Sequence, residues 1–351
     1  MSQADLRAGL IGFGLAGSVF HGPLIASAPG IVLSTIVTSD SERAARAARE
    51  HPDATVKESP NAVLHHPEEH DLVVVATRND SHVALAKAAI DAGISVVVDK
   101  PLAPSSGEAR DLVAHAKRRG VGLTVFHNRR WDSDQLTLRR LIAEGRLGEV
   151  QRYESRFERW RPELNEKAWR DTTPPGQGGG VLLDLGTHLV DQALALFGPA
   201  VDAQGEVAHR RDGPADDDAF VVLEHESGVH SHLWASSVTA EPGPRLRVLG
   251  SDAAFVVDSL DGQEEALAEG RRPEPGGEWG AEPKERWGRL VRGDESEPVR
   301  PENGDWPAFY RLVAQALRGE GPMPVDPADA VEVLEILERA RRGPGVQLPP
   351  S

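Results

Sequence analysis

Short runs of apolar residues alternate with amphipathic stretches over the first third of the chain. The apolar runs fall at residues 8–11, 32–37, 72–76, 95–98 and 122–126. Between them, residues 41–50 and 82–92 have apolar side chains at helical spacing, and Gly93 follows the second stretch as a helix C-cap does. Buried parallel strands joined by crossover helices produce this alternation. The pattern therefore predicts a doubly wound α/β domain over residues 1–124.

Beyond residue 124 the apolar positions repeat with a period of two. After a helix expected at residues 133–144, strands are expected at residues 150–160, 201–209, 219–226, 228–238, 246–250 and 253–257. Turns such as Glu226-Ser227-Gly228 join consecutive strands, which predicts a largely antiparallel sheet. We therefore expect an α+β domain with an open-faced sheet over residues 125–351.

The remaining segments of this second domain are expected around the sheet. The candidates to cover one face are the helices expected at residues 181–197, 306–318 and 327–341. The stretch 261–303 is rich in Pro, Gly and acidic residues, so we expect a long surface excursion. Because these helices are too few to cover both faces, the open face predicts a homodimer or homotetramer.

Composition limits the partners and the chemistry of this chain of 351 residues. Its formal net charge of -16 repels phosphate backbones and anionic lipids, and no basic run offsets it, so we expect neither nucleic acid nor membrane partners. The absence of cysteine leaves redox chemistry to a bound cofactor. Residues 1–7 are polar, and no segment approaches the roughly 20 apolar residues of a membrane span. These features predict a soluble, cytoplasmic protein without a secretory signal.

A glycine-rich motif closes the first expected strand and opens a helix. It reads Gly12-Phe13-Gly14-Leu15-Ala16-Gly17. In a dinucleotide-binding fingerprint the first glycine permits a tight turn, the second lets the backbone approach a pyrophosphate, and the third allows close helix packing. The helix N-terminus adds amide donors and a positive dipole. The motif predicts a Rossmann domain that binds a dinucleotide.

The end of the second expected strand bears on the choice between NAD and NADP. NAD enzymes usually place an acidic residue there against the ribose 2'-hydroxyl, whereas this strand ends in Thr38-Ser39. A neutral hydroxyl does not repel a 2'-phosphate, and Arg43 is close enough in sequence to reach one. Asp40 precedes a helix and is at least as well suited to cap it as to bind ribose. Both cofactors stay open, with NADP favoured by Thr38.

Two further strand ends carry polar residues at the carboxyl edge, where a doubly wound sheet binds its ligand. Thr77, Asn79 and His82 follow the strand at 72–76 and either line the nicotinamide ribose or cap the next helix. Asp99-Lys100-Pro101 follows the strand at 95–98. A lysine there either meets a carboxylate or ligand, where burial suits it to acid/base work, or lies solvated in a surface turn.

Asp184 and His188 lie four residues apart on an expected helix and follow a run of three glycines. Sharing one helix face would suit an imidazole that is oriented by a carboxylate for proton transfer. The alternative is an ordinary pair on a helix surface. His225, His230 and His232 are scattered on strands, a pattern more typical of packing or surface residues than of ligands, so no metal site is expected.

Together these motifs resemble the Gfo/Idh/MocA family, the glucose-fructose oxidoreductase and inositol dehydrogenase group. The resemblance runs through nearly the whole chain and is closest to the branch that contains NADP-dependent scyllo-inositol dehydrogenases. Residues 14–21, 127–132 and 261–267 carry the likeness to that branch. The chain departs from the family at Asp99, where glutamate is usual, and from the branch at Asp40, where arginine is frequent.

The resemblance implies a role for each of five residues. Lys100 would lie beside the nicotinamide and contact the reacting hydroxyl, and His188 would be the general acid/base. Asp184 would orient His188 or bind a neighbouring hydroxyl. Asn128 and Arg129 would lie on the substrate side, although Arg129 is equally compatible with a structural role.

The expected reaction is hydride transfer between the nicotinamide of NAD or NADP and a carbinol carbon of a sugar or an inositol-like polyol. The hydroxyl proton would pass to His188 or Lys100 as the carbonyl forms. Two other readings stay open: a nucleotide-binding sensor without catalysis, and a reductase of a non-sugar carbonyl.

Overall fold

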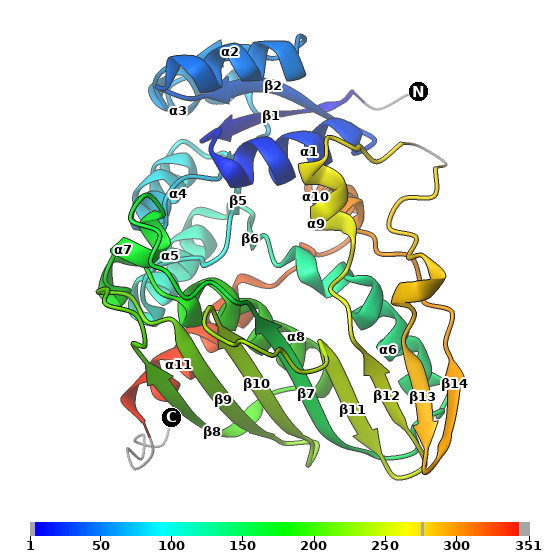
Figure 1. Cartoon of the computed structure of the whole chain (residues 1–351). Coiled ribbons are helices and arrows are strands. Elements are labelled where there is room, and N and C mark those ends of the chain that lie inside the picture. The colour runs from blue at the N-terminus through cyan, green and yellow to red at the C-terminus, as the bar shows by residue number, and fades with distance from the viewer. Residues whose placement is uncertain (1–3, 275–276, 344–351) are drawn as a thin grey trace.

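The computed structural model describes residues 4–274 and 277–343, and it contains two sheets that lie one above the other in Figure 1. The first sheet is at the top of that view, in blue and cyan, and the second is at the bottom, from green to orange. Residues 1–3 of the polar N-terminus and residues 344–351 of the expected second domain lie outside the described ranges.

The first sheet consists of six parallel strands in the order β3-β2-β1-β4-β5-β6. The strands are β1 Leu6–Ile11, β2 Ile31–Val37, β3 Thr55–Lys57, β4 Leu72–Val75, β5 Ser95–Val98 and β6 Leu123–Val125. The helices of this half are α1 Gly22–Ser27, α2 Ser41–Glu50, α3 Asn61–Leu64, α4 His82–Asp91 and α5 Ser106–Arg119. The strand order reverses between β1 and β4, which is where such sheets bind nucleotides. The predicted doubly wound fold is confirmed.

The second sheet consists of eight strands in the order β14-β13-β12-β11-β7-β10-β9-β8. The strands are β7 Val150–Glu158, β8 Ala200–Ala208, β9 Asp218–His225, β10 His230–Ser236, β11 Leu246–Gly250, β12 Ala254–Val257, β13 Arg289–Arg292 and β14 Glu295–Pro298. Only the β7/β10 pair is parallel among the pairs of this sheet in the described chain. The predicted α+β half with a largely antiparallel sheet is therefore confirmed.

Helices cover one face of the second sheet. The helices of this half are α6 Ser133–Ala143, α7 Trp169–Thr172, α8 Thr187–Phe197, α9 Gln263–Ala268, α10 Pro307–Leu317 and α11 Pro327–Arg342. Helix α8 packs on β7 and β10, and α11 packs on β8 and on α5 of the first half. On β9 and β10 the residues between the buried ones, such as Phe220 and Trp234, are half-buried and stack on each other.

The composition of the stretch 261–303 suggested a long surface excursion, but the stretch also contains regular structure. It contains α9 and the β13/β14 hairpin, and the hairpin pairs with β12 and extends the sheet. Only Leu290 of this hairpin is buried, in one cluster with Phe255. An edge hairpin that is anchored by a single apolar side chain has no alternating pattern for sequence analysis to detect.

Helix α10 does not cover the second sheet, so that expectation is wrong. Its residues Phe309, Tyr310 and Val313 are fully buried in one cluster with Leu10 and Ile25 of the first half. The helix therefore packs beside α1, on a face of the parallel sheet. Its apolar stripe predicted burial, but such a stripe does not identify the sheet that receives it.

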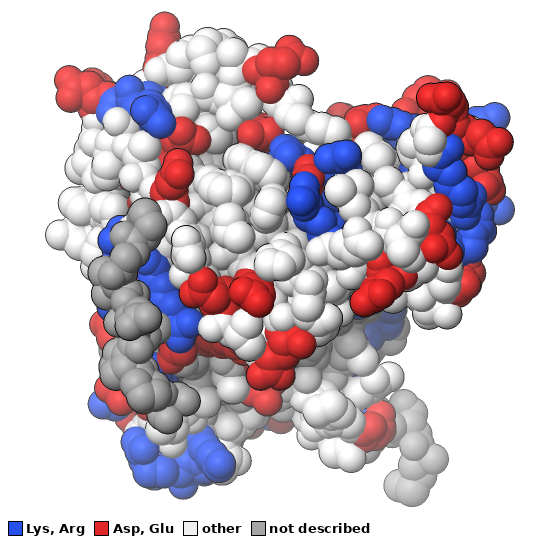
Figure 2. Space-filling model, turned by 90° about the horizontal axis from the view of Figure 1, so that it is seen from below, with Lys and Arg blue, Asp and Glu red and all other residues white. Residues whose placement is uncertain are grey.

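Charge and helix length are the last general features. Seen from below, acidic and basic side chains are interspersed around a broad neutral area (Figure 2). Every helix in the described residues is too short or too polar to cross a bilayer.

Candidate active site

The glycine motif forms the turn between β1 and a helical segment that starts with a π-helical turn at Ala16–His21. Gly12 has φ of +103°, which a residue with a side chain rarely adopts. A Cβ on Gly17 would clash with the Gly12 carbonyl oxygen, so the third glycine allows close packing. Gly14 faces open space, since the nearest atom to a Cβ there is Arg43 Nη1 at 3.9 Å. The three positions fit the turn, the pyrophosphate approach and the packing of a dinucleotide fingerprint.

The residues between these glycines differ in exposure. Phe13 is buried and packs edge-on against His51 with ring centroids 5.9 Å apart, so only its backbone faces the turn. Leu15 is 66% exposed, and both Leu15 and Ala16 line a cavity that is described below. The loop therefore presents backbone and small apolar surface to a ligand.

The end of β2 carries a buried threonine and a helix cap. Thr38 is buried, whereas Ser39 and Arg43 are exposed. Asp40 caps α2, because its carboxylate accepts a hydrogen bond from the Arg43 backbone nitrogen at 2.9 Å. The backbone nitrogen of Asp40 in turn donates to the Thr38 hydroxyl at 3.4 Å.

The residues after β4 bind neighbouring protein groups. The Asn79 side chain is buried and donates to the carbonyl of Gly178 at 2.8 Å. His82 is fully buried, and its ring nitrogens lie 2.8 Å from the Pro101 carbonyl and 3.3 Å from the Thr77 carbonyl. Both side chains fix loops around the site, and their contact with a ribose stays a prediction.

Asp99 is buried beneath the loop that follows β5. Its carboxylate accepts the backbone N–H of Lys100 at 2.8 Å and lies 3.7 Å from the His21 ring. The other nitrogen of that ring is 2.6 Å from the Tyr310 hydroxyl. Burial alone would raise the pKa of Asp99, but the adjacent His21 and Lys100 hold it below its usual range. The carboxylate is therefore ionised and fixes the start of the loop.

Lys100 joins the two halves of the molecule at Asp184. Its Nζ donates to the carboxylate and to the backbone carbonyl of Asp184, both at 2.6 Å. Arg170 donates to the same carboxylate at 3.0 Å. Burial would raise the pKa of Asp184, but attraction from Lys100 and Arg170 holds it well below its ordinary value. Two cations thus share one ionised carboxylate.

Asp184 and His188 make no hydrogen bond to each other in the described chain, so the expected orienting contact is wrong. Residues Leu182–Gly186 form a π-helical turn before α8, and both side chains line the same cavity. The Asp184 carboxylate is also already occupied by Lys100 and Arg170.

His188 is buried but lines the same cavity as Lys100. Its Nδ1 has no hydrogen-bond partner within the described residues, and its ring packs edge-on against His127 and Phe157. Burial is the main reason that the pKa of His188 lies well below its ordinary value, and the charges of Lys100 and Arg129 lower it further. The imidazole is therefore neutral at pH 7.

Asn128 and Arg129 are both buried in the wall of the cavity. The guanidinium of Arg129 pairs with Glu264 and with Asp132, and it lies over the Phe157 ring at 4.9 Å. Acidic side chains of the protein itself therefore pair with the positive charge of Arg129.

The cavity holding these groups has a volume of about 440 Å³, within the range of roughly 300–1,000 Å³ that is typical of small-molecule sites. Its lining comes from both halves of the chain. It includes Ala16, Lys100, Arg129, Arg159, Asp184 and His188. Leu15 and Ala16 of the glycine turn and the charged residues of the second half give the cavity chemically distinct parts.

Comparisons with known proteins agree with this architecture. Residues 6–127 match the oxidoreductase family with an NAD-binding Rossmann fold, and residues 135–256 match the GFO/IDH/MocA C-terminal domain. The chain is 40% identical to the uncharacterized oxidoreductase YdgJ of Escherichia coli strain K12, with 95% of each chain covered. This chain belongs to the Gfo/Idh/MocA family. The predicted family and enzyme class are thereby confirmed.

Two further relatives of this Gfo/Idh/MocA protein are informative. It is 35% identical to the NADP(+)-dependent scyllo-inositol 2-dehydrogenase IolW of Bacillus subtilis strain 168, over 95% of this chain and 92% of that protein. A solved oxidoreductase from Bacillus cereus superposes with a TM-score of 0.86 at 26% identity, with 99% of each chain covered.

Sequence reasoning gave no role to several residues of the Gfo/Idh/MocA site. Arg170 lies in the short helix α7 and Arg159 follows β7, both without a recognisable pattern, and only the folded chain brings them to the cavity of Asp184. His21 and Glu264 fall inside the segments that carried the resemblance, and this was the available signal for them.

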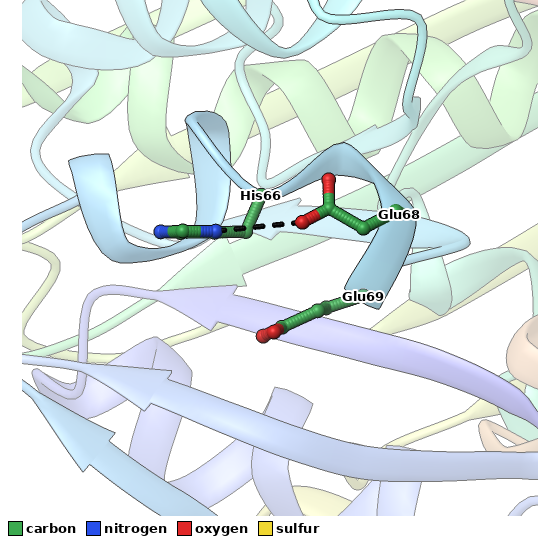
Figure 3. A group of neighbouring side chains, drawn as sticks. All are labelled: His66, Glu68 and Glu69. Carbon is green, nitrogen blue, oxygen red and sulfur yellow. Dashed lines mark ion pairs between the residues drawn. The ribbon is translucent and has the colours of Figure 1, made fainter.

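No metal role is assigned to the histidines of β9 and β10. The His225 ring nitrogens lie 2.8 Å from the Gly198 carbonyl and 2.8 Å from the Ser231 hydroxyl. His66, Glu68 and Glu69 have ligand atoms within 4.8 Å of one another, but all three are exposed (Figure 3). The ion pair of His66 with Glu68 at 3.5 Å explains their proximity.

Proposed function

We propose that this chain interconverts a secondary alcohol and a ketone on a sugar or an inositol-like polyol, with NAD or NADP as the hydride carrier. The observation that carries the proposal is the meeting of Lys100 and Asp184 in one cavity with a neutral His188. A lysine ammonium and a neutral imidazole in one small cavity suit proton transfer at a hydroxyl. The similarity to IolW, which is named as acting on scyllo-inositol, supports the substrate class.

The residues of the glycine turn fit a dinucleotide. A Cβ on Gly12 or on Gly17 would clash with neighbouring backbone atoms, so only glycine fits at these two positions. Gly14 leaves the backbone open beside the Arg43 guanidinium. Thr38 offers no carboxylate against a ribose 2'-phosphate, and Arg43 adds a positive charge nearby, so NADP is favoured. When bound, the nicotinamide supplies the hydride acceptor or donor.

In our proposal the chain's own residues hold the substrate and move its proton. Asp184 fixes the Lys100 ammonium, which stabilises negative charge on the substrate oxygen. During oxidation His188 accepts the hydroxyl proton, because its lowered pKa keeps the ring neutral at pH 7. During reduction the same proton returns to the oxygen. Asp184 acts through Lys100 and not as a proton carrier.

A substrate panel tests this function. Inositols, aldoses and their keto forms are supplied with NAD and NADP in parallel, and the change in reduced nicotinamide is followed by absorbance. We expect turnover of at least one polyol or its keto form, and product analysis should identify a ketone or a secondary alcohol. Tight cofactor binding without turnover of any carbonyl or alcohol would contradict the proposal and favour the sensor.

A further inference from the structure

Arg159 follows β7 directly and lines the cavity of Lys100 and His188. Its backbone is fixed, since its N–H donates to the Ser236 carbonyl at 2.9 Å and its carbonyl accepts from Thr239 at 3.1 Å. The side chain is half-buried. Burial is the main cause that lowers the pKa of its guanidinium.

The other cations of the cavity wall that are not exposed have acidic partners. Lys100 and Arg170 share Asp184, Arg129 pairs with Glu264, and Arg211 pairs with Asp171. Arg159 makes no ion pair or side-chain hydrogen bond with any described residue. Glu264 and Asp184 attract it most strongly, but neither lies within 4.0 Å of it, and both are occupied by other cations.

A partly buried guanidinium without a partner is costly, and its planar fork of donors matches a carboxylate or a phosphate with two parallel hydrogen bonds. From this geometry we infer that the substrate carries an anionic group, a carboxylate or a phosphate, that binds Arg159 while the reacting carbinol meets Lys100 and His188. This inference rests on the proposed redox function of the same cavity. The preferred substrate is then a sugar acid or a sugar phosphate, and a neutral polyol binds more weakly.

The anion belongs to the substrate and not to the cofactor. Arg159 comes from the second sheet, whereas the phosphate-binding features are Gly14 and Arg43 at the end of β1 and the start of α2. The attraction between Arg159 and Asp184, whose carboxylate holds Lys100, ties the anion site to the reacting end of the cavity.

The test uses three probes with the same ring stereochemistry: D-glucose, D-glucuronate and D-glucose 6-phosphate. Binding of each to the protein loaded with NADPH is measured by calorimetry for the wild type, Arg159→Gln and Arg159→Lys. Arg152→Gln is the matched control, because Arg152 is an exposed arginine on β7, the strand that Arg159 follows, and does not line the cavity.

We expect at least one anionic probe to bind the wild type about 10- to 100-fold more tightly than glucose, the range of a charge-assisted hydrogen bond. Arg159→Gln should abolish this preference without changing NADPH affinity, Arg159→Lys should restore part of it, and Arg152→Gln should retain it. Preference for glucuronate alone identifies a carboxylate, and preference for the 6-phosphate alone identifies a phosphate.

Equal affinity for all three probes, undetectable binding of both anions, or an anion preference that survives Arg159→Gln would overturn the inference. These outcomes are separate from the fate of the redox function. Turnover of neutral polyols without an anion preference leaves that function intact. If the anion preference depends on Arg159 but the protein turns over no alcohol or carbonyl, the anion site is supported and the proposed redox function is contradicted.

Discussion

The shared carboxylate of Asp184 allows catalysis to be separated from ion pairing. Lys100 and Arg170 contact the same oxygen at 2.6 and 3.0 Å, with side chains 11% and 32% exposed. Lys100→Met and Arg170→Gln each remove one charged donor, at a cost of about 1.5–3 kcal/mol in the free energy of unfolding. Because the other cation remains, the larger loss of about 3–5 kcal/mol for an unpaired buried charge should not occur. The cost for Arg170→Gln should lie at the low end, since water screens this more exposed residue.

The two variants should differ in turnover. Lys100→Met should lower kcat about 100-fold or more, which corresponds to about 2.7 kcal/mol of activation free energy, whereas Arg170→Gln should lower it less than about 10-fold. Urea unfolding measures stability, NADPH fluorescence measures cofactor affinity, and kcat is measured on the substrate found by the panel. Equal losses of kcat in both variants, or near-normal kcat in Lys100→Met, would refute the reasoning.

Four further outcomes are expected. His188→Ala should lower kcat by about 100-fold or more with unchanged NADPH affinity, and a normal kcat would remove His188 from proton transfer. Thr38→Asp should weaken NADP far more than NAD, whereas equal effects would show that Thr38 does not contact the ribose. Burial raises the pKa of Asp261 to about 6, above about 3.9 in the unfolded chain. The protonated carboxyl therefore contributes up to about 3 kcal/mol to the free energy of unfolding. This contribution is complete below about pH 4 and is lost as the pH rises through about 6. Between pH 4 and 7, the free energy of unfolding measured with urea should fall less in Asp261→Asn than in the wild type. The same dependence of this free energy on pH in both proteins would contradict the prediction. Light scattering should show a dimer or tetramer, since no helix of the described residues covers the Phe220/Trp234 face of the second sheet, and a monomer at micromolar concentration would count against that.

The parts of the fold that sequence predicted well are those in which burial repeats regularly. Residues 95–98 form β5 as predicted, because a parallel strand that is covered on both faces must be apolar throughout. Helix α2 has its predicted bounds, since Asp40 caps it and its side chains follow helical spacing. The glycine motif could be recognised because its spacing after a strand is itself the signal: Gly12 has a positive φ, Gly14 leaves the backbone open, and Gly17 packs on the Gly12 carbonyl.

The parts that sequence did not predict depend on contacts between distant residues. No local pattern links Arg170 or Arg159 to Lys100, which comes from another sheet. The spacing of Asp184 and His188 predicted a contact between them, but the Asp184 carboxylate pairs instead with Lys100 and Arg170. Ion pairs between distant parts of the chain therefore limit how much of the site can be predicted from sequence, whereas the approximate location of the site could be predicted.

The packing of α10 against the parallel sheet has a consequence for the order of synthesis. Leu10, Leu24 and Ile25 leave the ribosome early, but Phe309, Tyr310 and Val313, which complete their cluster, follow nearly 300 residues later. A nascent chain that has finished its six parallel strands therefore still exposes an apolar surface, and exposed surface of this kind makes folding intermediates prone to aggregation. The half with the parallel sheet therefore cannot complete this cluster before α10 has been translated, and a fragment that ends after β6 would lack the cover that α10 provides.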